Sequence, residues 1–114
     1  MKRTHYTKEL EGLKPGEEVV IAGWVHSLKD LGKILFIWLR DSQGLAQITI
    51  SKEKASKDVL EVSEGLGLQD VIVVEGRIAE ERRAKVGQEV IPSKIQLLSK
   101  AEAPLPLDPT GQVE

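Results

Sequence analysis

A chain of 114 residues without cysteine is long enough to bury one hydrophobic core, and it excludes disulfide scaffolds, thiol catalysis and cysteine-based zinc sites. Its net charge of -2 argues against a sequence-indifferent binder of polyanions, but it leaves room for a local basic patch that reads a few bases. No apolar run reaches the roughly 18 residues of a membrane span and the N-terminus is polar, so we expect a cytoplasmic protein without membrane contact.

The first half of the chain predicts three strands joined by tight turns. Residues 18–28 are rich in β-branched and aromatic side chains and follow the breaker Lys14-Pro15-Gly16. Residues 33–40 form a second strand after the turn at 30–32. The loop 41–44 ends in Gly44, which can adopt the left-handed conformation of a bulged hairpin turn, so residues 45–51 return as a third strand.

The second half predicts one helix, two strands and a tail. Residues 52–64 combine good helix formers with apolar side chains at helical spacing and end near Gly65. Residues 71–79 are almost continuously apolar, and residues 89–98 carry a strand pattern in which Pro92 indicates an edge or a bulge. A charged loop, 80–87, separates them. The proline-rich segment 103–114 indicates an extended linker, which leaves residues 1–102 as the folded domain.

This order of elements is typical of one fold class. Three strands, a helix and two strands match an all-β OB-fold, a five-stranded Greek-key barrel with one helix between strands 3 and 4. A ferredoxin-like fold needs a second helix, for which no segment remains. We therefore expect a single OB-fold barrel with a small helical contribution.

Strand alternation sorts the side chains between the barrel core and an outer face. The expected core positions in the first three strands are Val19, Ile21, Val25, Leu35, Ile37, Leu39, Ala46, Ile48 and Ile50. The side chains expected on the outer face include Trp24, His26, Phe36, Trp38, Arg40, Gln47 and Thr49. The outer face therefore holds three of the four aromatic residues of the chain.

Aromatic rings on such a face suit the stacking of unpaired bases, a contact worth roughly 1–3 kcal/mol per base. We single out Phe36 as the stacking platform, whereas Trp24 and Trp38 can equally pack beneath neighbouring loops. The Gln47 amide offers both a donor and an acceptor to a base edge, although a solvated strand glutamine is the simpler interpretation. His26 either bonds a base or caps the strand end.

Several motifs, taken in order, resemble one known family. They are Arg3-Thr4-His5, Gly23-Trp24-Val25, Lys29-Asp30-Leu31-Gly32, Phe36 followed by Arg40-Asp41, Gly44 with Gln47, and the exit segment 103–111. In this order and spacing the chain resembles the N-terminal anticodon-binding domain of archaeal-type aspartyl-tRNA synthetases, which belong to class IIb. The resemblance covers nearly the whole chain.

The resemblance implies an RNA-binding site on strands 1 to 3 and on the loop between strands 4 and 5. By position, Phe36 resembles the residue that stacks on the central anticodon base, and Gln47 resembles the residue that hydrogen-bonds this base. Lys29 resembles a basic residue near the first anticodon base, and Glu89 an acidic residue that contacts anticodon bases. Alternation places Glu89 on one face with Ile91, so a bulge at Pro92 must reset the strand. The other members of the expected site are Trp24, His26, Thr49, Arg82, Arg83 and Lys85.

Members of this family differ in how strictly they read the third anticodon base, and the difference is associated with two positions that correspond to His26 and to the loop around Arg83 in this sequence. A histidine at the position of His26 resembles enzymes that charge both tRNA-Asp and tRNA-Asn. The basic loop around Arg83 has no proline, which departs from that pattern. The implied partner is the anticodon loop of tRNA-Asp, with tRNA-Asn left open as a second one.

The resemblance also implies what this chain lacks. Class II synthetases activate their amino acid with ATP and magnesium in a domain that follows the linker, and the motifs of that domain do not fit beyond Gly111. We therefore expect no cofactor, no metal and no aminoacylation for this chain. The longer parent protein is expected to be a homodimeric aspartate-tRNA ligase.

Two other function classes compete with RNA recognition. A protein-interaction OB-fold, natural or engineered, would use the same aromatic residues to dock a protein, because Trp, Tyr and Arg are enriched in interface hot spots. An enzyme in its own right has little support. Asp30, Asp41 and Asp70 lie beside turns, where aspartate commonly bonds its own backbone, and no Ser-His-Asp set shares a predicted face.

Overall fold

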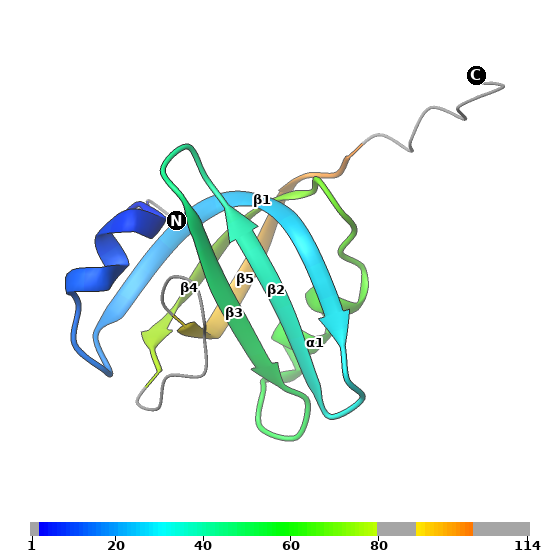
Figure 1. Cartoon of the computed structure of the whole chain (residues 1–114). Helices are drawn as coiled ribbons and strands as arrows, with labels where there is room; N and C mark the ends of the chain where they lie inside the picture. The colour runs from blue at the N-terminus through cyan, green and yellow to red at the C-terminus, as the bar shows by residue number, and fades with distance from the viewer. Residues whose placement is uncertain (1–2, 80–88, 102–114) are drawn as a thin grey trace, which may run out of the picture.

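The computed structural model of the chain describes residues 3–79 and 89–101, which form five strands, one α-helix and one 3-10 helix (Figure 1). The strands are β1 (Glu18–Asp30), β2 (Ile34–Arg40), β3 (Leu45–Ser51), β4 (Val71–Ile78) and β5 (Glu89–Ser99). The helix α1 (Lys57–Glu64) lies between β3 and β4, and the 3-10 helix η1 (Thr7–Gly12) precedes β1. The strand order β1-β2-β3-β5-β4 closes into a barrel because β4 also pairs with β1, which confirms the predicted all-β OB-fold.

The described strands agree closely with the predicted ones, but the helix begins later than predicted. The Ser51 carbonyl accepts hydrogen bonds from the backbone N–H groups of Lys54 and Ala55, at 3.1 and 2.8 Å, so the chain turns here instead of starting a helix. The helix starts after Ser56, whose hydroxyl oxygen accepts a 3.2 Å hydrogen bond from the Val59 N–H and caps it. Helical spacing in the sequence did not predict the start of α1 after Ser56, because the charged residues before Ser56 fit the same helical periodicity as the helix itself.

Side chains from all five described strands fill the barrel interior. Every core position expected in the first three strands is buried. The last two strands add Ile72, Val74, Ile78, Val90 and Ile95. Two glycines allow the strands to approach closely: a Cβ on Gly23 would lie 2.2 Å from the Arg40 carbonyl oxygen, and one on Gly76 would lie 2.3 Å from that of Ile91.

The N-terminal 3-10 helix η1, which the sequence did not predict, covers one end of the barrel and buries Leu10 completely. Asp41, in the turn between β2 and β3, holds it there: its carboxylate accepts hydrogen bonds from the Thr7 N–H at 2.8 Å and the Thr7 hydroxyl at 2.7 Å. It also accepts the backbone N–H groups of Gln43 and Gly44 at 2.8 and 3.0 Å. Burial raises the pKa of Asp41, but these hydrogen bonds outweigh it and lower the pKa below its ordinary value.

The α-helix covers the opposite end, where it packs against β5 and buries Val59 (Figure 1). Close by, Asp70 ties the end of β5 to the turn before β4. Its carboxylate accepts hydrogen bonds from the Gly67 N–H at 2.8 Å, the Lys100 amine at 2.7 Å and the Ala101 N–H at 2.8 Å. Burial raises the pKa of Asp70, but these hydrogen bonds and the Lys100 charge outweigh it and lower the pKa.

The prediction that three aspartates bond the backbone of their own turns is confirmed. Besides Asp41 and Asp70, Asp30 accepts a 2.8 Å hydrogen bond from the Gly32 N–H. Asp30 also pairs with the Lys52 amine at 2.9 Å, and the two contacts lower the pKa of this exposed carboxyl. These three carboxylates stabilise turns, so we do not consider them candidate catalytic residues.

Candidate nucleic-acid interface

The outer side of the sheet carries two rows of residues in register, which we call the outer rows. In the first row, Lys29 of β1 pairs with Phe36 of β2, and Phe36 pairs with Thr49 of β3. The second row consists of Ser27, Trp38, Gln47 and Glu89, from β1, β2, β3 and β5. Because neighbouring strands lie about 4.8 Å apart, each row sets its side chains side by side across three or four strands.

A β-bulge in β1 places Lys29 in this arrangement. The pairing of β1 with β2 shifts between Val25 and Ser27, so His26 is an extra residue without a partner on β2. The bulge reverses the alternation and brings Lys29 opposite Phe36. His26 is exposed at this bulge, which agrees with its expected place away from the core, although it has no partner on β2.

The aromatic residues of the outer face are only half-buried. Phe36, Trp38 and Trp24 all keep part of their surface open to solvent. The rings of Phe36 and Trp38 are 5.8 Å apart between centroids and tilted by 38°, which is a favourable aromatic contact. Trp38 therefore packs against the Phe36 ring, while Phe36 keeps part of its surface exposed.

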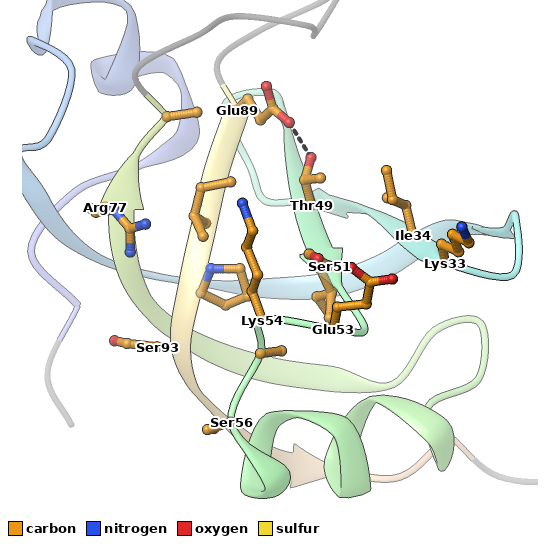
Figure 2. Close-up of a pocket in the computed structure, with 15 residues that line it drawn as sticks. Lys33, Ile34, Thr49, Ser51, Glu53, Lys54, Ser56, Arg77, Glu89 and Ser93 are labelled. Atoms are coloured by element: carbon orange, nitrogen blue, oxygen red, sulfur yellow. Dashed lines mark hydrogen bonds between the residues drawn. The ribbon is translucent and has the colours of Figure 1, made fainter.

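Gln47, Thr49 and Glu89 form a hydrogen-bonded chain next to these rings. The Gln47 Nε2 group donates to the Thr49 hydroxyl oxygen at 3.1 Å. The Thr49 hydroxyl donates to the Glu89 carboxylate (Figure 2). Alternation correctly placed Gln47 and Thr49 opposite the core side chains, but the expectation that they face open solvent is wrong. Their exposed fractions are 6% and 5%, and that of Glu89 is 2%. The reason is that β5 pairs with β3 in parallel and brings Glu89 against both.

A second bulge lies farther along β5. The pairing with β4 skips Ser93, directly after Pro92, and the next core side chain is Ile95. The expected irregularity near Pro92 therefore exists, but it follows Glu89 and Ile91 and does not separate them. These two residues share the outer side of β5, and Ile91 is half-buried there.

An open groove of about 770 Å³ begins at this polar chain and runs between β3, β5 and the connection 52–56. Thr49 and Glu89 lie in its wall, and the basic residues along it are Lys33, Lys54 and Arg77 (Figure 2). Its apolar lining includes Ile34, Ala55, Ile91 and Pro92. The sequence analysis did not single out Lys54, because it placed this residue within a helix that begins only later. Cations beside apolar surface suit a nucleotide strand, whose phosphates and bases need both.

Some expected features fall outside the described residues: Arg82, Arg83 and Lys85, the loop 80–87 around them, and the linker 103–114. Within residues 3–79 and 89–101, no cluster of three or more acidic or histidine side chains is arranged to hold a metal ion. None of the helices in this described part has both the length and the apolar character needed to span a bilayer.

The family model for tRNA anticodon-type OB-fold nucleic acid binding domains matches residues 19–98. The chain belongs to this family. The match spans β1 to the end of β5, so it includes the whole barrel and both outer rows. The resemblance expected from the motifs is confirmed at the level of the anticodon-type OB-fold domain.

Curated relatives of this anticodon-type domain are longer proteins. The aspartate–tRNA(Asp) ligase of Pyrococcus horikoshii is 48% identical over 114 residues, which are 100% of this chain and 26% of the relative. The aspartate–tRNA(Asp/Asn) ligase of Methanococcus vannielii is 45% identical over 112 residues, which are 98% of this chain and 26% of the relative. The chain thus spans 26% of the length of these relatives.

Solved structures similar to this domain come from two settings. The asparaginyl-tRNA synthetase of Pyrococcus horikoshii matches with a TM-score of 0.76 and 32% identity, over 96% of this chain and 26% of that one. OBody AM3L15, in complex with hen egg-white lysozyme, matches with a TM-score of 0.80 and 32% identity, over 95% of this chain and 98% of that one. One setting is a synthetase and the other a protein complex.

Proposed function

We propose that this anticodon-type OB-fold domain recognises the anticodon loop of tRNA-Asp as part of an aspartate-tRNA ligase. The observation that carries the proposal is the register of the outer rows. They place a cation (Lys29), a half-buried ring (Phe36) and a buried amide (Gln47) on neighbouring strands. The family match and the curated relatives support the assignment to tRNA and the aspartate specificity.

Each of these side chains has a chemical task in this proposal. An unpaired base stacks on the open side of Phe36, and its edge meets the Gln47 amide. Lys29 is the cross-strand partner of Phe36, and its amine neutralises a phosphate, which positions the strand without reading its sequence. Since the whole chain has a net charge of -2, such local cations provide the attraction for RNA.

Replacing Phe36 tests the stacking contact. We expect Phe36→Ala to weaken binding of an anticodon stem-loop with the sequence GUC by roughly 1–3 kcal/mol, as for other base-stacking residues. Phe36→Leu keeps apolar volume without an aromatic face and should lose most of the same affinity. The measurement is fluorescence anisotropy with labelled RNA, after circular dichroism has shown that each variant is folded. Leu98→Ala removes an exposed side chain outside the outer rows and serves as the control. Unchanged affinity in Phe36→Ala would contradict the proposal.

Salt dependence separates RNA recognition from the docking of a protein partner. The logarithm of the binding constant for the stem-loop should fall by about 0.7 per logarithmic unit of salt for each single-stranded phosphate neutralised. OBody AM3L15 is bound to hen egg-white lysozyme in its structure, but similarity in fold does not make lysozyme a partner of this chain. Stem-loop binding that is insensitive to salt would favour the protein-docking alternative.

The third anticodon base is the finer part of the proposal. His26 is exposed at its bulge, and no hydrogen bond to its ring comes from the described residues. We expect this histidine to leave the third base unread, so that stem-loops GUC and GUU bind within about threefold of each other, a difference well below that of a read base. A charging assay of the full-length enzyme on tRNA-Asn, with and without His26→Trp, extends the test. Absence of tRNA-Asn charging by the unmodified enzyme would refute this part.

The remaining functions belong to the longer protein in this proposal. The chain spans 26% of its curated relatives, so amino-acid activation with ATP and magnesium is assigned to the rest of their length. The domain alone binds tRNA and transfers no amino acid. The full enzyme is expected to act as a homodimer in the cytoplasm.

A further inference from the structure

The Gln47 side chain is buried, and of its two polar atoms only Nε2 has a hydrogen-bond partner among the described residues. Its exposed fraction is 6%, and its Nε2 group donates to the Thr49 hydroxyl at 3.1 Å. Among the described residues, none donates a hydrogen bond to Gln47 Oε1. Buried polar atoms in folded proteins are almost always hydrogen-bonded, so this oxygen calls for a donor that the described residues do not supply.

We propose that Thr49 is a positioning residue that locks the Gln47 amide in one orientation and thereby selects uracil over cytosine at the central anticodon base. The inference rests on the function proposed above. Glu89 sets the direction of these hydrogen bonds, because a carboxylate oxygen only accepts hydrogen bonds. The single hydroxyl proton of Thr49 is therefore committed to Glu89.

The Thr49 oxygen is then left as an acceptor, so the Gln47 atom that faces it has to be the Nε2 donor. A flipped amide would set Oε1 against the Thr49 oxygen, which is a contact between two acceptors. The orientation with Nε2 toward Thr49 is favoured by roughly 5- to 150-fold, the effect of one unmade hydrogen bond in a buried site. Gln47 therefore presents its Oε1 and one remaining N–H to the ligand.

This fixed pattern discriminates between the two pyrimidines. Uracil carries an N3–H that donates to Oε1, and a neighbouring carbonyl that accepts the free N–H of Gln47. Cytosine in the same pose places an unprotonated N3 against Oε1, so two acceptors meet. An amide that is free to turn over would satisfy cytosine as well, by donating to N3 and accepting from the exocyclic amine. Both bases stack on Phe36 with similar area, so the lock alone sets the preference.

The experiment compares the affinity of the chain for two stem-loops, with anticodons GUC and GCC, in three proteins. We expect the unmodified chain to prefer GUC by about 5- to 150-fold, the range for one well-made base contact. Thr49→Val keeps the volume but removes the hydroxyl, and should reduce this ratio to within about threefold. Thr49→Ser keeps the hydroxyl and should restore it. A matched pair, GUC and GUU, differs only at the third base, and its ratio should not change in any variant.

Three results decide the matter. A Thr49→Val protein that retains the full preference for GUC overturns the lock and leaves the proposed function standing. An unmodified chain that binds both loops equally overturns the proposed function as well. A Thr49→Val protein that fails to fold is replaced by Thr49→Ala and by NMR of the unmodified chain. In the NMR spectra of the unmodified chain, one Gln47 side-chain amide proton should exchange slowly with solvent. Fast exchange of both protons would overturn the proposed role of Thr49.

Discussion

Asp41 joins the turn between β2 and β3 to the N-terminal 3-10 helix, and Asp41→Asn tests how much that link stabilises the barrel. One carboxylate oxygen accepts three donors, from the Thr7 hydroxyl and the N–H groups of Gln43 and Gly44. The other oxygen accepts the Thr7 N–H. Asparagine can keep its single carbonyl oxygen at the first position, but its NH₂ group then faces the Thr7 N–H, donor against donor.

The expected loss of stability follows from the number of hydrogen bonds that Asp41→Asn removes or weakens. One hydrogen bond to a buried charge is lost, worth about 1.5–3 kcal/mol, and the other three become neutral and weaker. We expect the free energy of unfolding to fall by about 2–4 kcal/mol at neutral pH, a large part of the roughly 5–15 kcal/mol of a typical domain. For a chain of this size the melting temperature should drop by about 8–16 °C.

The difference between the two proteins should also depend on pH. The folded pKa of Asp41 lies below its ordinary value, so the unfolded chain binds this proton more readily. The stabilisation is complete above the unfolded pKa of about 3.9 and is lost as the pH falls through the lower folded pKa. Asp30 and Asp70 have lowered pKa values as well, so both proteins lose stability in acid. Only the difference between them isolates Asp41.

The assay is urea unfolding followed by circular dichroism at neutral pH and at about pH 2.5, where the unfolded carboxyl is protonated. Glu61→Gln, at an exposed position of α1, is the matched control and should change stability by less than about 0.5 kcal/mol. An Asp41→Asn protein as stable as the original at neutral pH, or a stability gap that is equally large in acid, would refute the reasoning.

Two further predictions concern the backbone. Gly76→Ala should cost more than about 2 kcal/mol or prevent folding, because its Cβ would lie 2.3 Å from the Ile91 carbonyl oxygen, whereas Gly12→Ala meets nothing within 4 Å and should be nearly neutral. Thermal melts of both variants check this, and equal melting temperatures would contradict it. Asp70→Asn should speed hydrogen exchange at the Ala101 N–H, which loses its charged acceptor, while exchange within β2 stays slow. Unchanged protection at Ala101 would show that this contact does not hold the end of β5.

Local patterns in the sequence were sufficient for much of the fold. Alternation in the first three strands identified core positions that are all buried, because side-chain direction in a strand depends only on the neighbouring residues. Turn chemistry placed Asp30, Asp41 and Asp70 correctly, since each bonds backbone groups of its own turn. The order of elements then left the OB-fold as the class that accommodated them.

The predicted contacts of Phe36, Gln47, Lys29 and Glu89 with RNA are still to be tested, but their relative positions are now described. Lys29 lies opposite Phe36 only because a bulge at His26 shifts the register, and residue type gave no sign of it. The start of α1 and the helix η1 were missed for a similar reason. Each depends on a hydrogen bond, at Ser56 or at Asp41, that competes with the local periodicity.

The sequence by itself determined which residues of the first three strands face the barrel interior, where the turns lie and which family the chain belongs to, because all three follow from local spacing and motif order. Only the tertiary structure decided that Gln47 and Thr49 are enclosed, with Gln47 hydrogen-bonded to Thr49 and Thr49 hydrogen-bonded to Glu89. That arrangement requires β5 to pair in parallel with β3 across a long stretch of chain. A pairing between segments so far apart depends on the closure of the whole barrel, which no local pattern encodes.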